Sequence, residues 1–177
     1  MRLEPIAEAH RDGLRAAAER EWHIHRYTNM ATFGFDRWFD MALETQSEVP
    51  FVVVANGAPA GSSRYLNVEP LHKRVEIGWT WLERAYWGSG ANVEAKYLLM
   101  RHAFEDEGYL RVEFKTDAAN ERSRPALEKV GATFEGVARK HQLVRGGERR
   151  DSAWYAVIDD DWPGAKASIE RRLGWRE

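Results

Sequence analysis

Two glycines stand one residue apart in the segment GSGAN, positions 88–92, directly before a stretch with helical spacing at positions 92–104. A predicted strand ends just upstream, at Trp81-Leu82, so the segment reads as a strand-to-helix turn. Unpaired backbone N–H groups and the positive end of the helix dipole converge at a helix N-terminus. Phosphate oxygens suit such a turn, although a tight turn in which glycine only relieves strain has the same pattern.

Two familiar phosphate motifs do not fit this segment. A Walker A loop requires Gly-Lys-Ser/Thr, and the chain has Gly90-Ala91-Asn92 instead. A dinucleotide fingerprint requires a third glycine at position 93, where the chain has Val93, and the surrounding elements are not a repeated βαβ unit. What remains is a diphosphate held by backbone N–H groups without an essential metal.

The elements that position this turn follow from the periodicity of the apolar residues. We predict helices at 5–21, 36–44, 92–104, 120–131 and 165–173, and strands at 49–55, 59–68, 74–82, 111–117, 132–144 and 149–158. Asp36 could cap the second helix, Gly131 is placed to end the fourth, and Asn56-Gly57 is a hairpin signal. No repeat or linker divides the chain, so we expect one α/β domain with a mixed sheet over residues 1–177.

Within this domain, two elements carry the residues of interest. Alternation along strand 74–82 predicts one face with Val75, Ile77, Trp79 and Trp81, and an opposite face with Glu76, Gly78 and Thr80. The spacing of helix 92–104 places four apolar residues near one face, namely Val93, Tyr97, Met100 and Phe104.

Composition narrows the classes of function. The net charge of the 177 residues is −2, so no overall field attracts nucleic acid. The chain contains no cysteine, which excludes disulfides and thiolate metal sites and is compatible with a reducing compartment. The charged N-terminal segment does not resemble a signal peptide, and no apolar run approaches the roughly 20 residues of a membrane span. We therefore expect a cytoplasmic protein without a membrane or nucleic-acid partner.

Four motifs follow one another along the chain: VEIGWTWL at 75–82, YWGSGANVEA at 86–95, FKTDAANERSRPALEKVGATFEGVAR at 114–139 and GGERRDSAWYAV at 146–157. In order and spacing they resemble the fourth strand, the diphosphate loop, the Asn-x-x-Ser helix with its Lys-x-Gly turn, and the Gly-x-x-Arg-Asp hairpin of the GNAT acetyltransferases, most closely of their RimJ/RimL-like branch. The resemblance is strongest from Glu76 to Asp151 and looser from Phe51 to Pro163, and the first 48 residues add little.

The resemblance implies a mixed, mostly antiparallel central sheet flanked by helices and splayed at the fourth and fifth strands. It also implies acetyl-CoA as cosubstrate, without a metal. The implied cofactor-binding residues are the turn Trp87, Gly88, Ser89, Gly90, Ala91 and Asn92, backbone groups at Trp81, Leu82 and Glu83, and the side chains of Asn120 and Ser123. The first residue of the family's Gln/Arg-x-x-Gly-x-Gly/Ala loop corresponds to Ala85 here, which departs from the pattern. Arg84, one residue earlier, could take its place.

The implied chemistry is acetyl transfer to an amine, which must be neutral when it attacks the thioester. An α-amine, with a pKa of about 8, needs less help from a base than a lysine, with a pKa of about 10.4. Glu76 is the candidate base, as it aligns with a general-base glutamate of some family members; an exposed strand residue or an ion-pair partner is the alternative. Glu135 and Asp151 are rivals, Asp151 with the alternative of a structural partner to an arginine near the hairpin.

The group that protonates the departing thiolate is less defined. Many members of the family place a tyrosine seven residues after the asparagine, and this position is Leu127 here. Ser123 could act directly or through water, or could simply make an ordinary helix-turn hydrogen bond. A CoA thiolate can also leave with little protonation.

Several further features have structural alternatives. The histidines of HIH at 23–25 could be metal ligands, but no third ligand stands in an obvious place. The eight tryptophans are expected to be mostly core, and three of them are alternatively candidates to line an acceptor cleft, namely Trp22, Trp38 and Trp87. Hairpin cations could attract a carboxylate or the 3′-phosphate of CoA, namely Arg139, Lys140 and His141.

Together these observations predict an N-acetyltransferase acting on a primary amine, either the α-amine of a protein N-terminus or a small-molecule amine. The alternative is a non-catalytic acyl-CoA-binding sensor or interaction domain that has kept the cofactor groove. Many relatives pair, and the chain is rich in aromatic residues, so a homodimer is a further expectation.

Overall fold

The computed structural model describes residues 1–20, 30–144 and 146–175. Within these ranges the strands form one seven-stranded sheet in the order β1-β2-β3-β4-β5-β7-β6. All neighbouring strands are antiparallel except β4 and β5, which are parallel. This confirms the prediction of a mixed, mostly antiparallel sheet flanked by helices.

The strands are β1 (Arg2–Pro5), β2 (Val49–Ala55), β3 (Ala58–Glu69), β4 (Arg74–Leu82), β5 (Arg111–Asp117), β6 (Thr133–Val144) and β7 (Glu148–Ile158). The helices are α1 (Arg11–Glu19), α2 (Met30–Phe33), α3 (Phe35–Glu44), α4 (Ala91–Arg101), α5 (Ser123–Glu128) and α6 (Trp162–Leu173). A π-helical turn, His102–Asp106, extends α4. No helix of the described residues is both long and apolar enough to cross a membrane.

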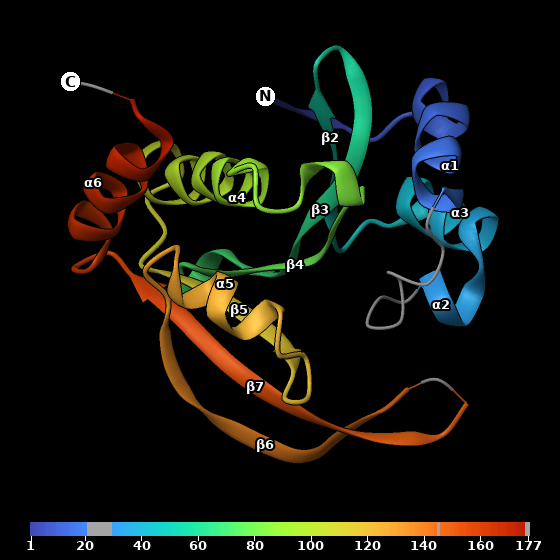
Figure 1. The fold of residues 1–177 in the computed structure, drawn as a ribbon. Helices are drawn as coiled ribbons and strands as arrows, with labels where there is room; N and C mark the ends of the chain where they lie inside the picture. The colour runs from blue at the N-terminus through green and yellow to red at the C-terminus, as the bar shows by residue number, and fades with distance from the viewer. Residues whose placement is uncertain (21–29, 145, 176–177) are drawn as a thin grey trace.

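Helices cover both faces of the sheet (Figure 1). One apolar cluster joins α1 and α3 to one face and includes Leu14, Trp38, Phe39, Val52 and Trp81. The other joins α4, α5 and α6 to the opposite face and includes Ile77, Tyr97, Phe114, Leu127 and Ile169. Three of the four residues predicted for the apolar face of α4 are buried in this second cluster, and Phe104 packs against it.

The N-terminal segment differs from the predicted helix 5–21. Residues Arg2–Pro5 form an edge strand that pairs with β2, a short 3₁₀ turn follows at Glu8–His10, and α1 begins only at Arg11. A four-residue strand is too short to show a periodicity of its own in the sequence. The predicted cap Asp36 is also wrong: Gly34, with φ of 77°, precedes α3, and Asp36 pairs with Arg15 on α1.

A β-bulge in β4 changes which residues share a face. The register with β3 passes from Arg64↔Gly78 to Ser62↔Trp81, so two residues of β4 oppose one of β3, and Trp79 has a φ of +50°. As a result Trp79 and Trp81 pack in the α1/α3 cluster, whereas Val75 and Ile77 pack in the α4/α6 cluster. The prediction that these four residues share one face is therefore wrong.

The parallel strands β4 and β5 separate after a short ladder. They pair from Arg74↔Arg111 to Glu76↔Glu113, where the register ends. Beyond that point β4 continues beside β3 to Leu82, and β5 continues beside β7 to Asp117. The sheet is thus splayed at its fourth and fifth strands, as the resemblance implied.

Candidate active site

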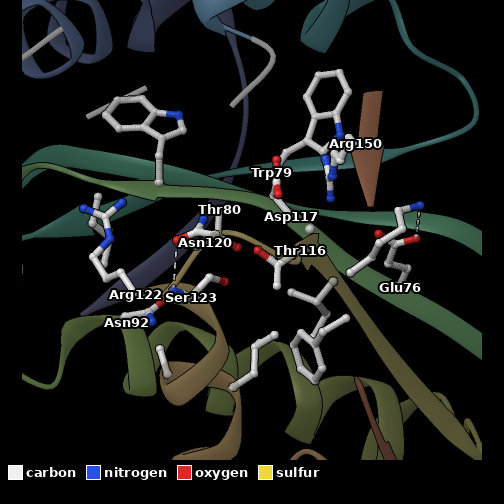
Figure 2. Close-up of a pocket in the computed structure, with 18 of the residues that line it drawn as sticks. Glu76, Trp79, Thr80, Asn92, Thr116, Asp117, Asn120, Arg122, Ser123 and Arg150 are labelled. Carbon is white, nitrogen blue, oxygen red and sulfur yellow. Dashed lines mark hydrogen bonds and ion pairs between the residues drawn. The ribbon is translucent and has the colours of Figure 1, made fainter. Parts of the chain in front are cut away.

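A cavity of about 860 Å³ lies where β4 and β5 separate. Most of the residues predicted for the site line it: Glu76, Trp81, Leu82, Trp87, Gly88, Asn92, Asn120 and Ser123. The remaining predicted residues, Glu83, Ser89, Gly90 and Ala91, are not among its lining residues. Figure 2 shows Asn92, Asn120, Arg122 and Ser123 gathered at one end and Glu76 at the other.

The turn before α4 has the backbone that its glycines predict. Gly88 and Gly90 have φ values of 75° and 89°, in the left-handed region that favours glycine. A Cβ added at Gly88 would meet nothing within 4 Å, whereas one at Gly90 would lie 3.3 Å from Leu173 Cδ2 on α6. Gly88 therefore leaves open space at the cavity, and Gly90 allows the turn to approach α6.

Ser89 and Trp87 fix the shape of this turn. Ser89 Oγ donates to Tyr86 O at 2.7 Å and accepts from the backbone N–H of Ala91 at 3.3 Å. The indole of Trp87 donates to Leu82 O at 2.9 Å, and the Arg122 guanidinium lies 3.8 Å from the Trp87 ring centroid. Trp87 thus ties the end of β4 to a cation. Asn92, Asn120, Arg122 and Ser123 lie at the end of the cavity where the resemblance implies that the cofactor binds, the cofactor end.

The end of β4 presents fewer backbone groups to the cavity than expected. The backbone N–H of Glu83 donates to Ala60 O at 2.9 Å, and its carboxylate pairs with Arg20. Of the three residues expected to contact a cofactor through the backbone, only Trp81 and Leu82 line the cavity.

Lys96 is a lining residue that the sequence analysis missed. It lies on α4 one turn after Asn92, and its Nζ donates to Asn92 Oδ1 at 2.5 Å. Only 6% of the residue is exposed, and this burial lowers the pKa of the ammonium to about 8. The one signal in the sequence is a lysine among the apolar positions of a helix, which is easily taken for a surface residue.

Asn120 and Ser123 lie together where β5 leads into α5. The backbone N–H of Asn120 donates to Asp117 O at 2.9 Å, and Asn120 Oδ1 accepts from the backbone N–H of Ser123 at 3.1 Å. This contact gives the first N–H group of α5, at Ser123, a side-chain acceptor. The side chains of both residues belong to the cavity lining at the cofactor end (Figure 2).

Glu76 is buried, with 2% of its surface exposed. Its Oε2 accepts hydrogen bonds from Asn67 Nδ2 at 2.8 Å and Lys115 Nζ at 3.3 Å. A Cβ added at Gly78 would lie 3.3 Å from Oε1 and 2.6 Å from Leu66 Cδ1. The ion-pair alternative therefore describes Oε2, and the missing side chain of Gly78 lets Leu66 and Oε1 lie close to the strand backbone.

The rival carboxylates lie elsewhere. Glu135 forms a hydrogen bond with Arg111 at 2.7 Å, and Asp151 accepts the backbone N–H of Lys140 at 2.6 Å. Neither lines the cavity. Asp151 therefore has a structural partner, as expected, but this partner is a backbone group and not an arginine.

Of the remaining aromatic and basic candidates, one lines the cavity and the others do not or lie outside the described residues. Trp38 is core and Trp87 lines the cofactor end, while Trp22 and the histidines of HIH fall outside the described residues. His141 contacts Ser152 Oγ at 3.1 Å, and burial, followed by the nearby Lys115 and Arg150, lowers its pKa. No group of three potential metal ligands occurs in the part of the chain that the structure describes.

Other lining residues had no signal in the sequence, because tertiary structure alone brings them to the cavity. They are Thr32 and Phe33 of α2, Trp79 in the bulge, and Leu143, Val144, Gly146, Gly147 and Arg150 of the β6–β7 hairpin. The charged lining residues are mostly basic: Lys96, Lys115, Arg122, Lys129 and Arg150, against Glu76 and Asp117. The cavity thus favours anionic groups.

Comparison with known proteins gives both sequence and structural relatives. The acetyltransferase (GNAT) domain model matches residues 1–133. A Bacillus subtilis (strain 168) protein named "Putative ribosomal N-acetyltransferase YdaF" is 30% identical over 111 residues, which cover 63% of this chain and 60% of that protein. The spermidine N(1)-acetyltransferase of Escherichia coli (strain K12) is 25% identical over 159 residues, which cover 90% of this chain and 83% of that protein.

Among solved structures, a GCN5-related N-acetyltransferase from Brucella melitensis has 32% sequence identity and a TM-score of 0.90. The match covers 97% of this chain and 81% of that chain. The likeness therefore extends over nearly the whole of this chain.

Proposed function

The chain belongs to the GNAT acetyltransferase family, and from this premise we propose that it transfers an acetyl group from acetyl-CoA to a primary amine. The acceptor is the α-amine of a protein N-terminus or a small-molecule amine. A ribosomal N-acetyltransferase among the relatives agrees with the RimJ/RimL-like branch. The observation that carries the proposal is that one cavity joins a phosphate-suited turn to a buried carboxylate through the gap between β4 and β5.

At the cofactor end, the turn from Trp87 to Asn92 receives the pyrophosphate on backbone N–H groups at the start of α4. The open space at Gly88 and the position of Arg122 support this placement. The pantetheine arm lies between β4 and β5, where the edge of β4 at Trp81 and Leu82 lines the cavity. Asn120 contributes its side-chain amide just before the start of α5.

At the other end, Glu76 Oε1 accepts the proton that the amine loses as its nitrogen bonds to the thioester carbon. The carbon–sulfur bond then breaks, and the CoA thiolate leaves with a proton from Ser123 or from water. Asn67 and Lys115 hold the carboxylate in place through Oε2, so Oε1 remains for the acceptor.

The charges of the cavity support an acceptor that carries little positive charge beyond its reacting amine. Five basic and two acidic side chains line the cavity, and Lys115 and Arg150 belong to the half that contains Glu76. A polycation such as spermidine would be repelled there, whereas a peptide N-terminus followed by acidic residues would be attracted.

Assembly and location complete the proposal. We propose a single domain that forms a homodimer through the edge strand β6, because its exposed residues include Phe134, Val137 and Leu143. Light scattering that gives the monomer mass of 20.4 kDa at micromolar concentration would contradict this. The lack of cysteine supports a cytoplasmic location, where thiols stay reduced.

The test is release of free CoA thiol when the protein meets acetyl-CoA and a panel of amines, with products identified by mass spectrometry. The panel contains acidic and basic N-terminal peptides, amino acids and spermidine. Acetylated product identifies an enzyme and its acceptor class. CoA binding without turnover on any amine would favour the alternative, a non-catalytic acyl-CoA-binding domain.

A further inference from the structure

Lys96 is a buried cation on α4, at a position where the packing of the helix does not require a charge. The residue is 6% exposed, so its ammonium is removed from water. It reaches back toward the N-terminal end of α4, where the helix dipole is also positive. Burial of a charge without an opposite charge is costly, and the dipole increases this cost.

No carboxylate among the described residues compensates this charge with an ion pair. The hydrogen-bond partner of Nζ is the neutral side-chain oxygen of Asn92. The nearest acidic residue along the helix, Glu94, instead pairs with the N-terminal amino group of Met1 at 3.1 Å. A buried ammonium with only a neutral partner, in a cavity wall, indicates a binding site for an anion.

We propose that Lys96 is a cofactor-binding residue whose ammonium neutralises the pyrophosphate of acetyl-CoA from inside the cavity. The inference rests on the proposed function. Asn92 positions Nζ at the first turn of α4, beside the N–H groups that point at the same phosphates. Lys96, Asn92 and Arg122 all line the cavity, and Figure 2 shows Asn92 and Arg122 at the end opposite Glu76, so both cations belong to the end that receives the diphosphate.

A direct role of Lys96 at the thioester fits the geometry less well. Its Nζ is held by Asn92, which lies at the opposite end of the labelled site from Glu76 (Figure 2). A lysine that protonated the thiolate would need to point along the cavity toward Glu76. The two roles differ in which part of CoA the lysine contacts, the pyrophosphate or the sulfur, and ligands that lack one of these parts distinguish them.

The experiment compares three ligands by calorimetry with the wild type and Lys96→Met: CoA, 3′-dephospho-CoA, which keeps the pyrophosphate, and pantetheine, which has no phosphate. Lys96→Met removes a charge-assisted hydrogen bond to the pyrophosphate, which is stronger than a hydrogen bond between neutral groups. We therefore expect Lys96→Met to weaken CoA and 3′-dephospho-CoA equally, by roughly 10- to 100-fold. Pantetheine affinity should change by less than about twofold.

Lys73→Met is the matched control, since Lys73 is an exposed lysine away from the cavity, and it should leave all three affinities unchanged. Lys96→Gln replaces Lys96→Met if the latter does not fold. Unchanged CoA affinity, an equal loss for pantetheine, or a loss for CoA but not for 3′-dephospho-CoA would each overturn the assignment. Failure of the wild type to bind CoA at all would instead reject the proposed function.

Discussion

The cost of burying Lys96 gives a prediction about the protein without its cofactor. Burial lowers the pKa of Lys96 from 10.5 to about 8. Since one pKa unit corresponds to about 1.4 kcal/mol, the charged lysine costs the folded state on the order of 3 kcal/mol. Lys96→Met removes the charge but keeps an unbranched side chain of similar length, so at pH 7 the variant should be more stable by about 1–3 kcal/mol.

The sign of the pH dependence follows from the same shift. The folded pKa lies below the unfolded pKa, so between about pH 8 and pH 10.5 the unfolded chain holds more protons than the folded one. Stability from this group therefore rises with pH across that window, and the penalty is fully present below pH 8. The advantage of Lys96→Met should shrink accordingly toward pH 10.

Urea denaturation at pH 7 and pH 10 measures both effects in the ligand-free protein. The other ionisable cavity residues near this end are Tyr86, Asp117, Arg122 and Lys129, and they are common to both proteins, so the difference between the two curves isolates Lys96. At pH 7, saturating CoA should offset the difference in stability, because a 10- to 100-fold tighter complex adds about 1.4–2.7 kcal/mol to the wild type relative to the variant. A stability difference that does not change with pH would refute the reasoning.

Three further predictions concern the acceptor end and the thiolate. Glu76→Gln should lower kcat/KM by about 10²–10⁴-fold, most at low pH where the acceptor is protonated, and full activity from pH 6 to 9 would make Glu76 a structural residue. Ser123→Ala should cause only a small loss of rate if the thiolate leaves unaided. If Ser123 is the acid, the loss of rate should grow with the basicity of the leaving thiol, and rates with acyl donors of different thiol pKa separate the two cases. Gly78→Ala should raise the acceptor KM without changing CoA affinity, because the new Cβ would lie 2.6 Å from Leu66 Cδ1 and 3.3 Å from Glu76 Oε1 and so displace the Leu66 side chain beside the carboxylate; a loss confined to CoA binding would place the acceptor end elsewhere.

The sequence predicted the elements that carry the cofactor end well. The strand-to-helix turn, the apolar face of α4 and the Asn56-Gly57 hairpin all depend on local patterns, and local patterns are visible in a single chain. Splaying of β4 and β5 came from the resemblance, since pairing between strands distant in sequence has no local signature.

What escaped prediction depended on tertiary structure. The bulge at Trp79 requires a left-handed conformation that tryptophan rarely adopts, so alternation gave the wrong faces beyond Gly78. The sequence around Lys96 does not show whether this lysine is buried or lies on the surface, and in the structure it is buried. Phe33 and Arg150 reach the cavity from distant segments, α2 and β7, and only the folded chain brings them together.

The bulge at Trp79 has a consequence for how this protein can change over generations. By switching faces within one strand, β4 contributes to two apolar clusters that have no buried residue in common. The α1/α3 cluster holds Trp79 and Trp81, whereas the α4/α6 cluster holds Val75 and Ile77. Substitutions in α1 and α3 can therefore shift the cavity wall at Trp79 and Trp81 without altering the contacts between α4 and α6, so the lining of the cavity and the packing of these two helices can evolve separately.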